Sequence, residues 1–469
     1  MTTTEPPAVR AGLTLAAVAV VQFAVSLDLS VVNVGLPRIA AALGFTAVGL
    51  TWVIHAYALT FGGLLLLGGK LADRHGRRRV LLAGLAVFGI ASLAGGFAQD
   101  PGQLVAARAA QGIGAAAAAP AALALLTATF PAGPERVRAF GVWSAMNAAG
   151  GALGVLIGGV LTEYAGWRWV MFVSAPMAAV AAVLARRGVN ADQPVRTGRP
   201  DVLGAVLATA GMTTLVFGVV RTDQHGWASP VTLATLAIAV ALLVAFVHIE
   251  RTTARDPLMR LGLLADRAVA GANLYNLLLG AAMASAFYFV SLYLQQVLGT
   301  GPALAGVQFL PFALGVVAGS VVAVKLGHRS APRTLMIGGG VLTAAGFAWF
   351  GFLSADGSFL ADVLGPSIVT SVGFGLCLGP VVSVATGGVV PGEAGTASGL
   401  LTSSRQIGAS LGLAALGTAA HSRSGTAGSA VDGYAFGLAL GAALLTVAVL
   451  IALTLVPARG SAPAGRAGR

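Results

Sequence analysis

Charged residues and cysteines are both scarce in this sequence. Only 9% of its 469 residues are Asp, Glu, Lys or Arg, whereas 57% are hydrophobic. A water-soluble protein could not bury so much apolar surface, so the composition excludes a soluble fold and predicts an all-α polytopic membrane protein. Cys377 is the single cysteine, which excludes disulfides within the chain and zinc or iron–sulfur sites built from cysteines.

Sequence motifs for ATP hydrolysis and for catalysis are also missing. The absence of a Walker phosphate-binding loop argues against ATP-driven transport by this chain. No polar segment is long enough for a catalytic domain, and His, Asp and Glu do not cluster, so we expect no enzyme, metal or cofactor. The net charge of +12 does not indicate nucleic-acid binding, because the basic residues lie in short segments between apolar runs.

Apolar runs long enough to cross a bilayer fill most of the chain, and there are fourteen of them. They cover residues 11–36, 47–69, 79–99, 102–128, 138–162, 167–185, 202–220, 230–249, 268–296, 303–326, 333–354, 361–388, 396–420 and 434–456. With the N-terminus inside, 22 of the 28 Lys and Arg fall in cytoplasmic segments or at the cytoplasmic ends of spans, four fall on the outer side, and two lie deeper within spans. The positive-inside rule therefore predicts fourteen helices with both termini cytoplasmic. The first run is too long for the core of a cleaved signal peptide, so we expect it to be retained.

The sequence contains an internal repeat. The spacing of Glu135, Gly141, Gly150 and Gly154 recurs at Glu393, Gly399, Gly408 and Gly412. Two related halves are typical of transporters whose substrate binds between them near the bilayer midplane. We therefore predict six-helix halves at 11–185 and 268–456, a linker at 186–267 with two inserted helices, and cytoplasmic ends at 1–10 and 457–469.

Asp28 is the only acid well inside a predicted span. Desolvation penalises an ionised carboxylate, so such a residue can take up and release a proton. Arg108 and Gln111 share one face of the fourth span, and an intramembrane arginine needs an acid, carbonyl groups or water. We predict that Asp28 and Arg108 couple transport to protons. The alternatives are a hydrated structural acid near the outer surface and an arginine that snorkels to that surface.

The segment Gly69–Arg79 carries five basic residues and one acid between two apolar runs. We interpret it as a loop in which Gly69 and Gly76 permit tight packing and a chain reversal. Asp73 can pair locally, while Arg74 and Arg77 can bind helix carbonyls or an acid and so hold one conformation closed. The alternative is a loop that only sets membrane orientation.

Two further groups of residues are candidates for packing and substrate binding. In the fifth span, Gly150, Gly154 and Gly158 are spaced by four and form a groove where another helix can approach closely. Together with Gly141 and Gly159 they form a glycine ladder. Aromatic and polar residues of several spans are candidates to line a substrate cavity, since aromatic faces suit flat cations. These are Trp52, His55, Gln111, Asn147, Tyr288 and Arg405, with lipid-facing or ordinary packing positions as the alternative for the aromatic side chains.

Together these motifs resemble the fourteen-helix drug:proton antiporters (EmrB/QacA type) of the major facilitator superfamily, over nearly the whole chain. The resemblance rests on Asp28–Pro37, Gly69–Arg79, Arg108–Gly114, Gly141–Gly159, Gly395–Gly399 and Ser404–Gln406. It implies that Asp28 and Arg108 handle protons, that Asp73 and Arg74 belong to a gating loop, and that the glycine ladder is that of an exporter. The family's usual proline after the third glycine is Val155 in this chain, which bears on the direction of transport.

From these observations we predict a proton-coupled exporter of hydrophobic or cationic drugs in the cytoplasmic membrane. Its partners would be the small-molecule substrate, protons and the lipid bilayer, and a monomer is compatible with the sequence. One alternative is a dedicated exporter of a single endogenous metabolite, such as an antibiotic, siderophore or peptide. Another is a membrane sensor that transports nothing.

Overall fold

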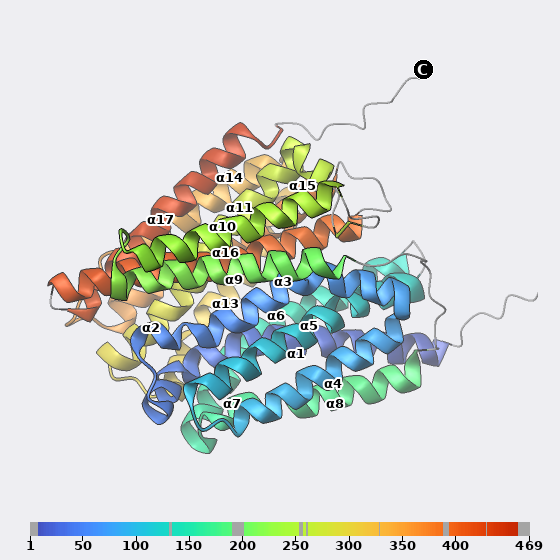
Figure 1. The fold of residues 1–469 in the computed structure, drawn as a ribbon, viewed down its shortest axis with the longest axis horizontal. Helices are drawn as coiled ribbons and strands as arrows, with labels where there is room; N and C mark the ends of the chain where they lie inside the picture. The colour runs from blue at the N-terminus through green and yellow to red at the C-terminus, as the bar shows by residue number, and fades with distance from the viewer. Residues whose placement is uncertain are drawn as a thin grey trace, which may run out of the picture. The chain divides into compact units, whose positions relative to one another are not determined.

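A computed structural model describes residues 8–130, 134–189, 201–252, 257–258, 261–327, 329–387, 394–427 and 429–457. Within these ranges the regular structure is entirely helical (Figure 1). This follows from the composition, because a helix satisfies its backbone hydrogen bonds within one segment and needs no water in the bilayer core. Glu393, most of the predicted N-terminal segment and most of the predicted tail lie outside the described residues.

The first of two compact units contains the first six long helices. It comprises residues 1–210, 242–258 and 300–309. Its elements are α1 (Ala8–Leu43), α2 (Ala47–Leu50), α3 (Trp52–His75), α4 (Arg77–Gly96), α5 (Pro101–Thr129), α6 (Pro134–Val160), the π-helical turn η1 (Leu161–Ala165), α7 (Arg168–Phe172), α8 (Ser174–Gly188) and α12 (Pro302–Gln308).

The second unit contains the later helices and comprises residues 211–241, 259–299 and 310–469. Its elements are η2 (Leu261–Ala265), α11 (Arg267–Leu292), η3 (Tyr293–Val297), α13 (Leu310–Gly327), α14 (Pro332–Phe350), η4 (Phe359–Leu364), α15 (Gly365–Gly387), α16 (Ala394–Ala427) and α17 (Ala430–Thr454). The helices α9 (Val202–His225) and α10 (Pro230–Thr252) contribute residues to both units.

These elements make fourteen long helical spans, as predicted. Twelve of them are long and apolar enough to cross a membrane by length and composition, within the described part of the chain. The other two are α14, which has 19 residues and begins with Pro332 and Arg333, and α16, which carries many Ser, Thr and Gly residues. Each of the fourteen predicted apolar runs coincides with one span, counting α7 with α8 and α12 with α13.

The predicted loop at Gly69–Arg79 is wrong in its extent. Helix α3 continues to His75 and α4 begins at Arg77, so Gly76 alone separates them. Gly76 has φ +92° and ψ 130°, a conformation that residues with a side chain rarely adopt. The sharp reversal is therefore made by one residue. Charge ended the apolar run but not the helix, because Lys, Arg, Leu and Ala all favour helix.

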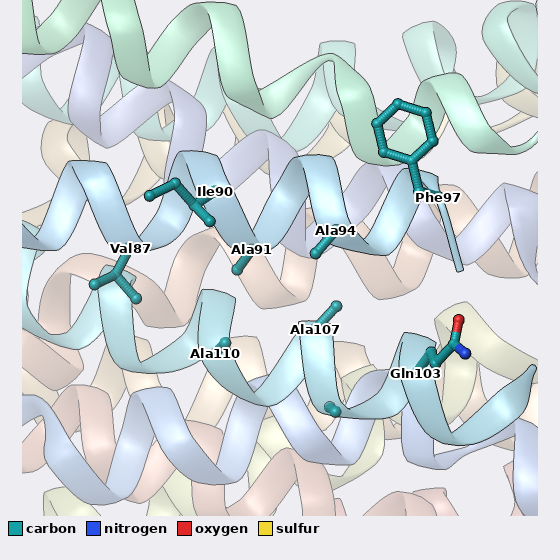
Figure 2. A pocket seen from close by; sticks show the side chains of 9 residues that line it. Val87, Ile90, Ala91, Ala94, Phe97, Gln103, Ala107 and Ala110 are labelled. Atoms are coloured by element: carbon teal, nitrogen blue, oxygen red, sulfur yellow. The ribbon is translucent and has the colours of Figure 1, made fainter. Parts of the chain in front are cut away.

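Neighbouring helices α4 and α5 leave a groove of about 630 Å³ on one side of the first unit. Its lining is almost entirely apolar and comprises Val87, Ile90, Ala91, Ala94, Phe97, Gln103, Ala106, Ala107 and Ala110. Ala91 and Ala94 of α4 face Ala107 and Ala110 of α5 across it (Figure 2). Small side chains along both helices thus leave space where larger ones would interlock.

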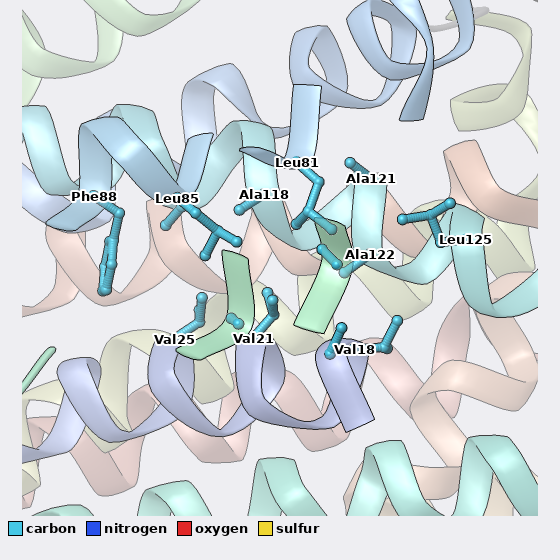
Figure 3. Close-up of a cluster of buried hydrophobic side chains, with 14 of the residues drawn as sticks. Val18, Val21, Val25, Leu81, Leu85, Phe88, Ala118, Ala121, Ala122 and Leu125 are labelled. Carbon is cyan, nitrogen blue, oxygen red and sulfur yellow. The ribbon is translucent and has the colours of Figure 1, made fainter. Parts of the chain in front are cut away.

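The core of the first unit lies where α1, α4 and α5 meet (Figure 3). Val18, Val21 and Val25 of α1 belong to one buried cluster with Leu81, Leu85 and Phe88 of α4. Helix α8, which contacts both α1 and α4, adds alanines to the same cluster. Helix α5 contributes alanines to this cluster, including Ala118, Ala121 and Ala122. Association of helices in lipid depends on close van der Waals packing, and the small α5 residues permit it. This packing fixes the helices that carry the polar site described next.

Candidate functional site

A buried ion pair lies at the centre of the first unit. Asp28, in the middle of α1, is 0% exposed and Arg108 of α5 is 2% exposed. Arg108 Nη1 donates to Asp28 Oδ2 at 2.6 Å. The burial of both groups disagrees with a hydrated Asp28 and with an Arg108 that snorkels to the surface.

Three donors surround the Asp28 carboxylate. Besides Arg108, Gln111 Nε2 donates to Oδ1 at 3.1 Å and Ser174 Oγ donates to the same oxygen at 3.1 Å. Such charge-assisted hydrogen bonds stabilise the ionised form of a buried carboxylate. The site therefore compensates one negative charge with one guanidinium and two neutral donors.

Arg108 is held in place from several directions. Its Nε donates to the carbonyl oxygen of Val53 at 3.0 Å, and Nη1 also donates to Gln111 Oε1 at 2.8 Å. The guanidinium carbon lies 4.5 Å from the centre of the Tyr57 ring, which is a cation–π arrangement. Val53 and Tyr57 are one turn apart in α3, so this helix supplies both contacts.

Gln111 connects the ion pair to α4. Its Nε2 donates to Ser92 Oγ at 2.7 Å, and Ser92 in turn donates to the carbonyl oxygen of Phe88 at 2.7 Å. Gln111 was predicted as a cavity residue, but it is 0% exposed and both ends of its amide bind other groups of this network. Five helices, α1, α3, α4, α5 and α8, thus meet at one polar cluster, which we call the Asp28 network.

Sequence reasoning identified Asp28, Arg108 and Gln111 but missed Ser92 and Ser174. Serine is common in membrane helices, and neither residue stands in a distinctive local pattern. Ser174 lies far along the chain from Asp28 and reaches it only because α8 packs on α1. The structure also places the ring of Tyr57 against the Arg108 guanidinium.

The residues predicted to form a gating loop have weaker contacts. Asp73, in the last turn of α3, and Arg77, the first residue of α4, approach to 3.9 Å across the break at Gly76. Both are partly exposed, so this pair adds little stability. The neighbouring Arg78 donates through Nη2 to the carbonyl oxygen of Arg186 near the end of α8, at 2.9 Å. The close helix approach occurs at Gly68, where a Cβ would overlap the carbonyl of Ala116, while one on Gly69 would lie 3.7 Å from Pro120. Arg74 lies partly buried in the last turn of α3.

The glycines of α6 differ in what they face. Gly150, Gly154 and Gly158 lie against the backbone of α1, at Phe23, Leu27 and Val31 respectively. Gly159 faces Pro302 at the start of α12, whereas Gly141 has no atom within 4 Å of where its Cβ would be. The close approach expected of a glycine ladder therefore involves three of its five members against α1. Val155, at the position where a proline was expected, is buried in continuous helix.

The remaining predicted cavity residues are not gathered in one place within either unit. Asn147 Oδ1 accepts hydrogen bonds from Gln22 Nε2 at 2.7 Å and from Ser26 Oγ at 2.5 Å. The His55 ring is buried, with the Trp52 ring 5.6 Å away and no hydrogen-bond partner for either nitrogen in the described structure. Tyr288 and Arg405 belong to the second unit, where Tyr288 packs edge-to-face on Phe289. None of the six lines the groove between α4 and α5.

Comparison with known proteins gives consistent results. Residues 18–413 match the family described as the Major Facilitator Superfamily. The chain is 42% identical to the cephamycin export protein CmcT of Amycolatopsis lactamdurans, covering 93% of this chain and 90% of the relative. It is 40% identical to the puromycin resistance protein pur8 of Streptomyces alboniger, covering 94% and 90%. A crystal structure of the POT family transporter PepTSo has the same fold, with a TM-score of 0.71 at 15% identity over 95% of this chain and 97% of that one.

Proposed function

The chain belongs to the major facilitator superfamily, and from that membership we propose that it is a proton-coupled exporter of antibiotic-like molecules. It is a multi-pass protein of the cell membrane and a transporter rather than an enzyme. Export is supported by the relatives, which are named for export of cephamycin and resistance to puromycin. Proton coupling is supported by one observation, the fully buried ion pair of Asp28 and Arg108.

In the proposed mechanism, the proton binds to the carboxylate of Asp28. Ionised Asp28 balances the charge of Arg108, which cannot lose its own proton in a protein. When Asp28 takes up a proton, the guanidinium keeps its bonds to Val53 and Gln111 but loses its counter-charge. The packing of α1 against α5 that suits the ionised pair is then no longer favoured.

The size of this effect is sufficient to drive a conformational change. Breaking a buried ion pair by neutralising one partner costs about 3–5 kcal/mol. Such a difference shifts a two-state equilibrium by roughly two to four orders of magnitude. Because the network joins five helices, a rearrangement at Asp28 would be transmitted to most of the first unit. Protonation from outside and release inside would then exchange a proton for a substrate molecule.

A second candidate is a dedicated exporter of one compound. It is favoured by the names of these two relatives, each of which refers to a single antibiotic. The two candidates share the fold and the proton site, so a compound panel separates them. Accumulation of one antibiotic and of nothing else would identify the dedicated exporter.

The experiment uses inverted membrane vesicles, in which export appears as uptake. Vesicles with the full chain receive puromycin, cephamycin or a fluorescent dye, with and without an acid-inside pH gradient. We expect gradient-dependent accumulation in the wild type and its loss in Asp28→Asn, normalised to folded protein by fluorescence size-exclusion chromatography. Asp356→Asn, which changes an exposed acid outside the network, is the matched control. Undiminished uptake by Asp28→Asn would remove Asp28 from the coupling step, and absence of any wild-type uptake would refute export.

A further inference from the structure

The internal repeat makes Arg405 of α16 the counterpart of Asn147 of α6. Asn147 stands three residues before Gly150, and Arg405 stands three residues before Gly408. Gly150 packs on the backbone of α1 at Phe23, and Gly408 packs in the same way on the backbone of α11 at Leu277. Each residue therefore occupies the same place in its own unit, beside the first helix of a half.

The two equivalent positions differ in how their polar groups are satisfied. Asn147 accepts hydrogen bonds from Gln22 and Ser26 of α1. At the corresponding contact in the second unit, α11 presents Gly280, and a Cβ there would lie 3.0 Å from Arg405 Cγ. The missing side chain makes room for the arginine stem. The guanidinium has no hydrogen bond or ion pair with the described residues.

A cation at this depth requires compensation. Arg405 lies eleven residues beyond the first residue of α16, about 16 Å along the helix axis, in a bilayer whose hydrocarbon core is about 30 Å thick. An intramembrane arginine pairs with an acid or backbone carbonyl, or faces a water-filled cavity. Arg108 illustrates the first solution, with Asp28 as its acid. Arg405 has no equivalent among the described residues.

Further hydrogen-bonding capacity is open on the same helix. Ser403 Oγ, Gln406 Nε2 and Ser410 Oγ are buried and have no partner in the described structure. All three can donate a hydrogen bond, and they lie within two turns of Arg405. The nearby amides of α11 are occupied, since Asn276 donates to the carbonyl of Leu401 and Asn273 accepts from Ser404. At about 100° per residue these three side chains lie about 100° to 160° around α16 from Arg405, so the positive charge without a partner is that of Arg405 alone.

We propose that Arg405 binds an anionic group, such as a carboxylate, of the transported molecule. The proposal rests on the exporter function and specifies its substrate class. A planar guanidinium binds a carboxylate through two parallel hydrogen bonds, which a neutral amide or a point charge cannot reproduce. Amphipathic acids and zwitterions are thus added to the hydrophobic and cationic compounds expected from the sequence.

The test compares a rhodamine dye that carries a free carboxyl group with the methyl ester of the same dye. Binding to the purified full chain in detergent is followed by fluorescence polarisation. We expect the wild type to bind the acid more tightly than the ester. Arg405→Gln should weaken binding of the acid by about tenfold to a hundredfold and leave ester binding within about twofold. Arg405→Lys, which keeps the charge without the planar guanidinium, should bind the acid with an affinity between those of the wild type and Arg405→Gln.

Arg423→Gln is the matched control, because it changes an exposed arginine on the same helix and should bind both dyes like the wild type. If Arg405→Gln does not fold, the wild type alone decides, since equal or weaker binding of the acid overturns the proposal. If the acid bound more tightly than the ester in gluconate buffer but not in chloride buffer, the site would be assigned to an inorganic anion. That result would also overturn the proposal. Failure of uptake in vesicles, with the acid preference intact, would refute the exporter function and leave the anion site standing.

Discussion

The polar residues of the Asp28 network donate hydrogen bonds to one another and accept them from one another. Arg108 cannot become neutral, whereas Asp28 can take up a proton, so the two partners of the pair are not equivalent. Removing the acid leaves a permanent buried cation. Removing the arginine leaves a carboxylate that protonation can neutralise. This asymmetry leads to a prediction for single and double variants.

We expect Asp28→Asn to be less stable than Arg108→Gln, because only the first leaves an uncompensated charge. Its cost should approach the roughly 3–5 kcal/mol of a broken buried pair. The double variant should unfold at a higher temperature than Asp28→Asn, since it contains no charge at the site. Thermal unfolding of the purified wild type, the two single variants and the double variant in detergent completes a double-mutant cycle. Additive effects of the two substitutions would show that the residues do not interact.

At the scale of elements, the glycines of α6 determine how closely it can approach α1. A Cβ on Gly158 would overlap the backbone of Val31, which cannot move without moving α1, whereas one on Gly141 would meet nothing. Alanine raises helix propensity by about 1 kcal/mol at either site. At Gly158 overpacking costs about 1–3 kcal/mol and outweighs that gain.

We therefore expect opposite signs from the same substitution in one helix. Gly158→Ala should lower the thermal unfolding temperature, and Gly141→Ala should leave it unchanged or raise it. Both variants are measured in the same detergent, with vesicle uptake as a second readout. If Gly141→Ala lowered the unfolding temperature, the packing of α6 on α1 would not explain how substitutions in the glycine ladder affect stability.

The break between α3 and α4 gives a second pair of variants. Gly76 adopts a backbone conformation that costs other residues about 1–3 kcal/mol. Gly69 is helical and a Cβ there would make an ordinary contact with Pro120. We expect Gly76→Ala to reduce the unfolding temperature and Gly69→Ala to preserve it. Equal stability of the two variants would contradict the role of Gly76 as the single turn residue.

The same segment shows what hydropathy can and cannot predict about an element. Lys70 and Arg79 mark where apolar residues give way to charge in the sequence. The helix ends were not predicted correctly, because their positions depend on backbone propensity rather than polarity. Only Gly76 interrupts the helical residues on both sides. Gly76 and Gly69 were both visible in the sequence as glycines next to basic residues. No local feature of the sequence showed which of the two ends the helix.

At the scale of the whole molecule, the count of fourteen spans followed from the sequence because apolar length and loop charge are local quantities. The composition of the Asp28 network did not, since Ser174 and Ser92 approach the ion pair only through packing of α8 and α4. Asp28 and Arg108 were recognisable because ionisable groups are rare in spans. Their partners are common residues that become specific only through tertiary contacts.

The two inserted helices α9 and α10 can be tested directly by labelling. Trp227, in the turn between them, is exposed. It would lie outside the cell if both helices cross the membrane and inside if neither does, while all other segments keep their sides in both cases. Cys377 is 0% exposed and lies 2.9 Å from the hydroxyl of Tyr275. The wild-type chain should therefore react little with a membrane-impermeant maleimide, and its labelling gives the background signal for the cysteine variants.

In intact cells we expect Trp227→Cys to be labelled as strongly as Tyr164→Cys, which lies in an exposed segment predicted to be outside. His75→Cys and Arg329→Cys occupy exposed positions predicted to be cytoplasmic, and they should react only after the membrane is permeabilised. The reason is topological, because each additional crossing reverses the side of the next segment. Labelling of Trp227→Cys only after permeabilisation would reduce the spanning helices to twelve and would place α9 and α10 on the cytoplasmic side.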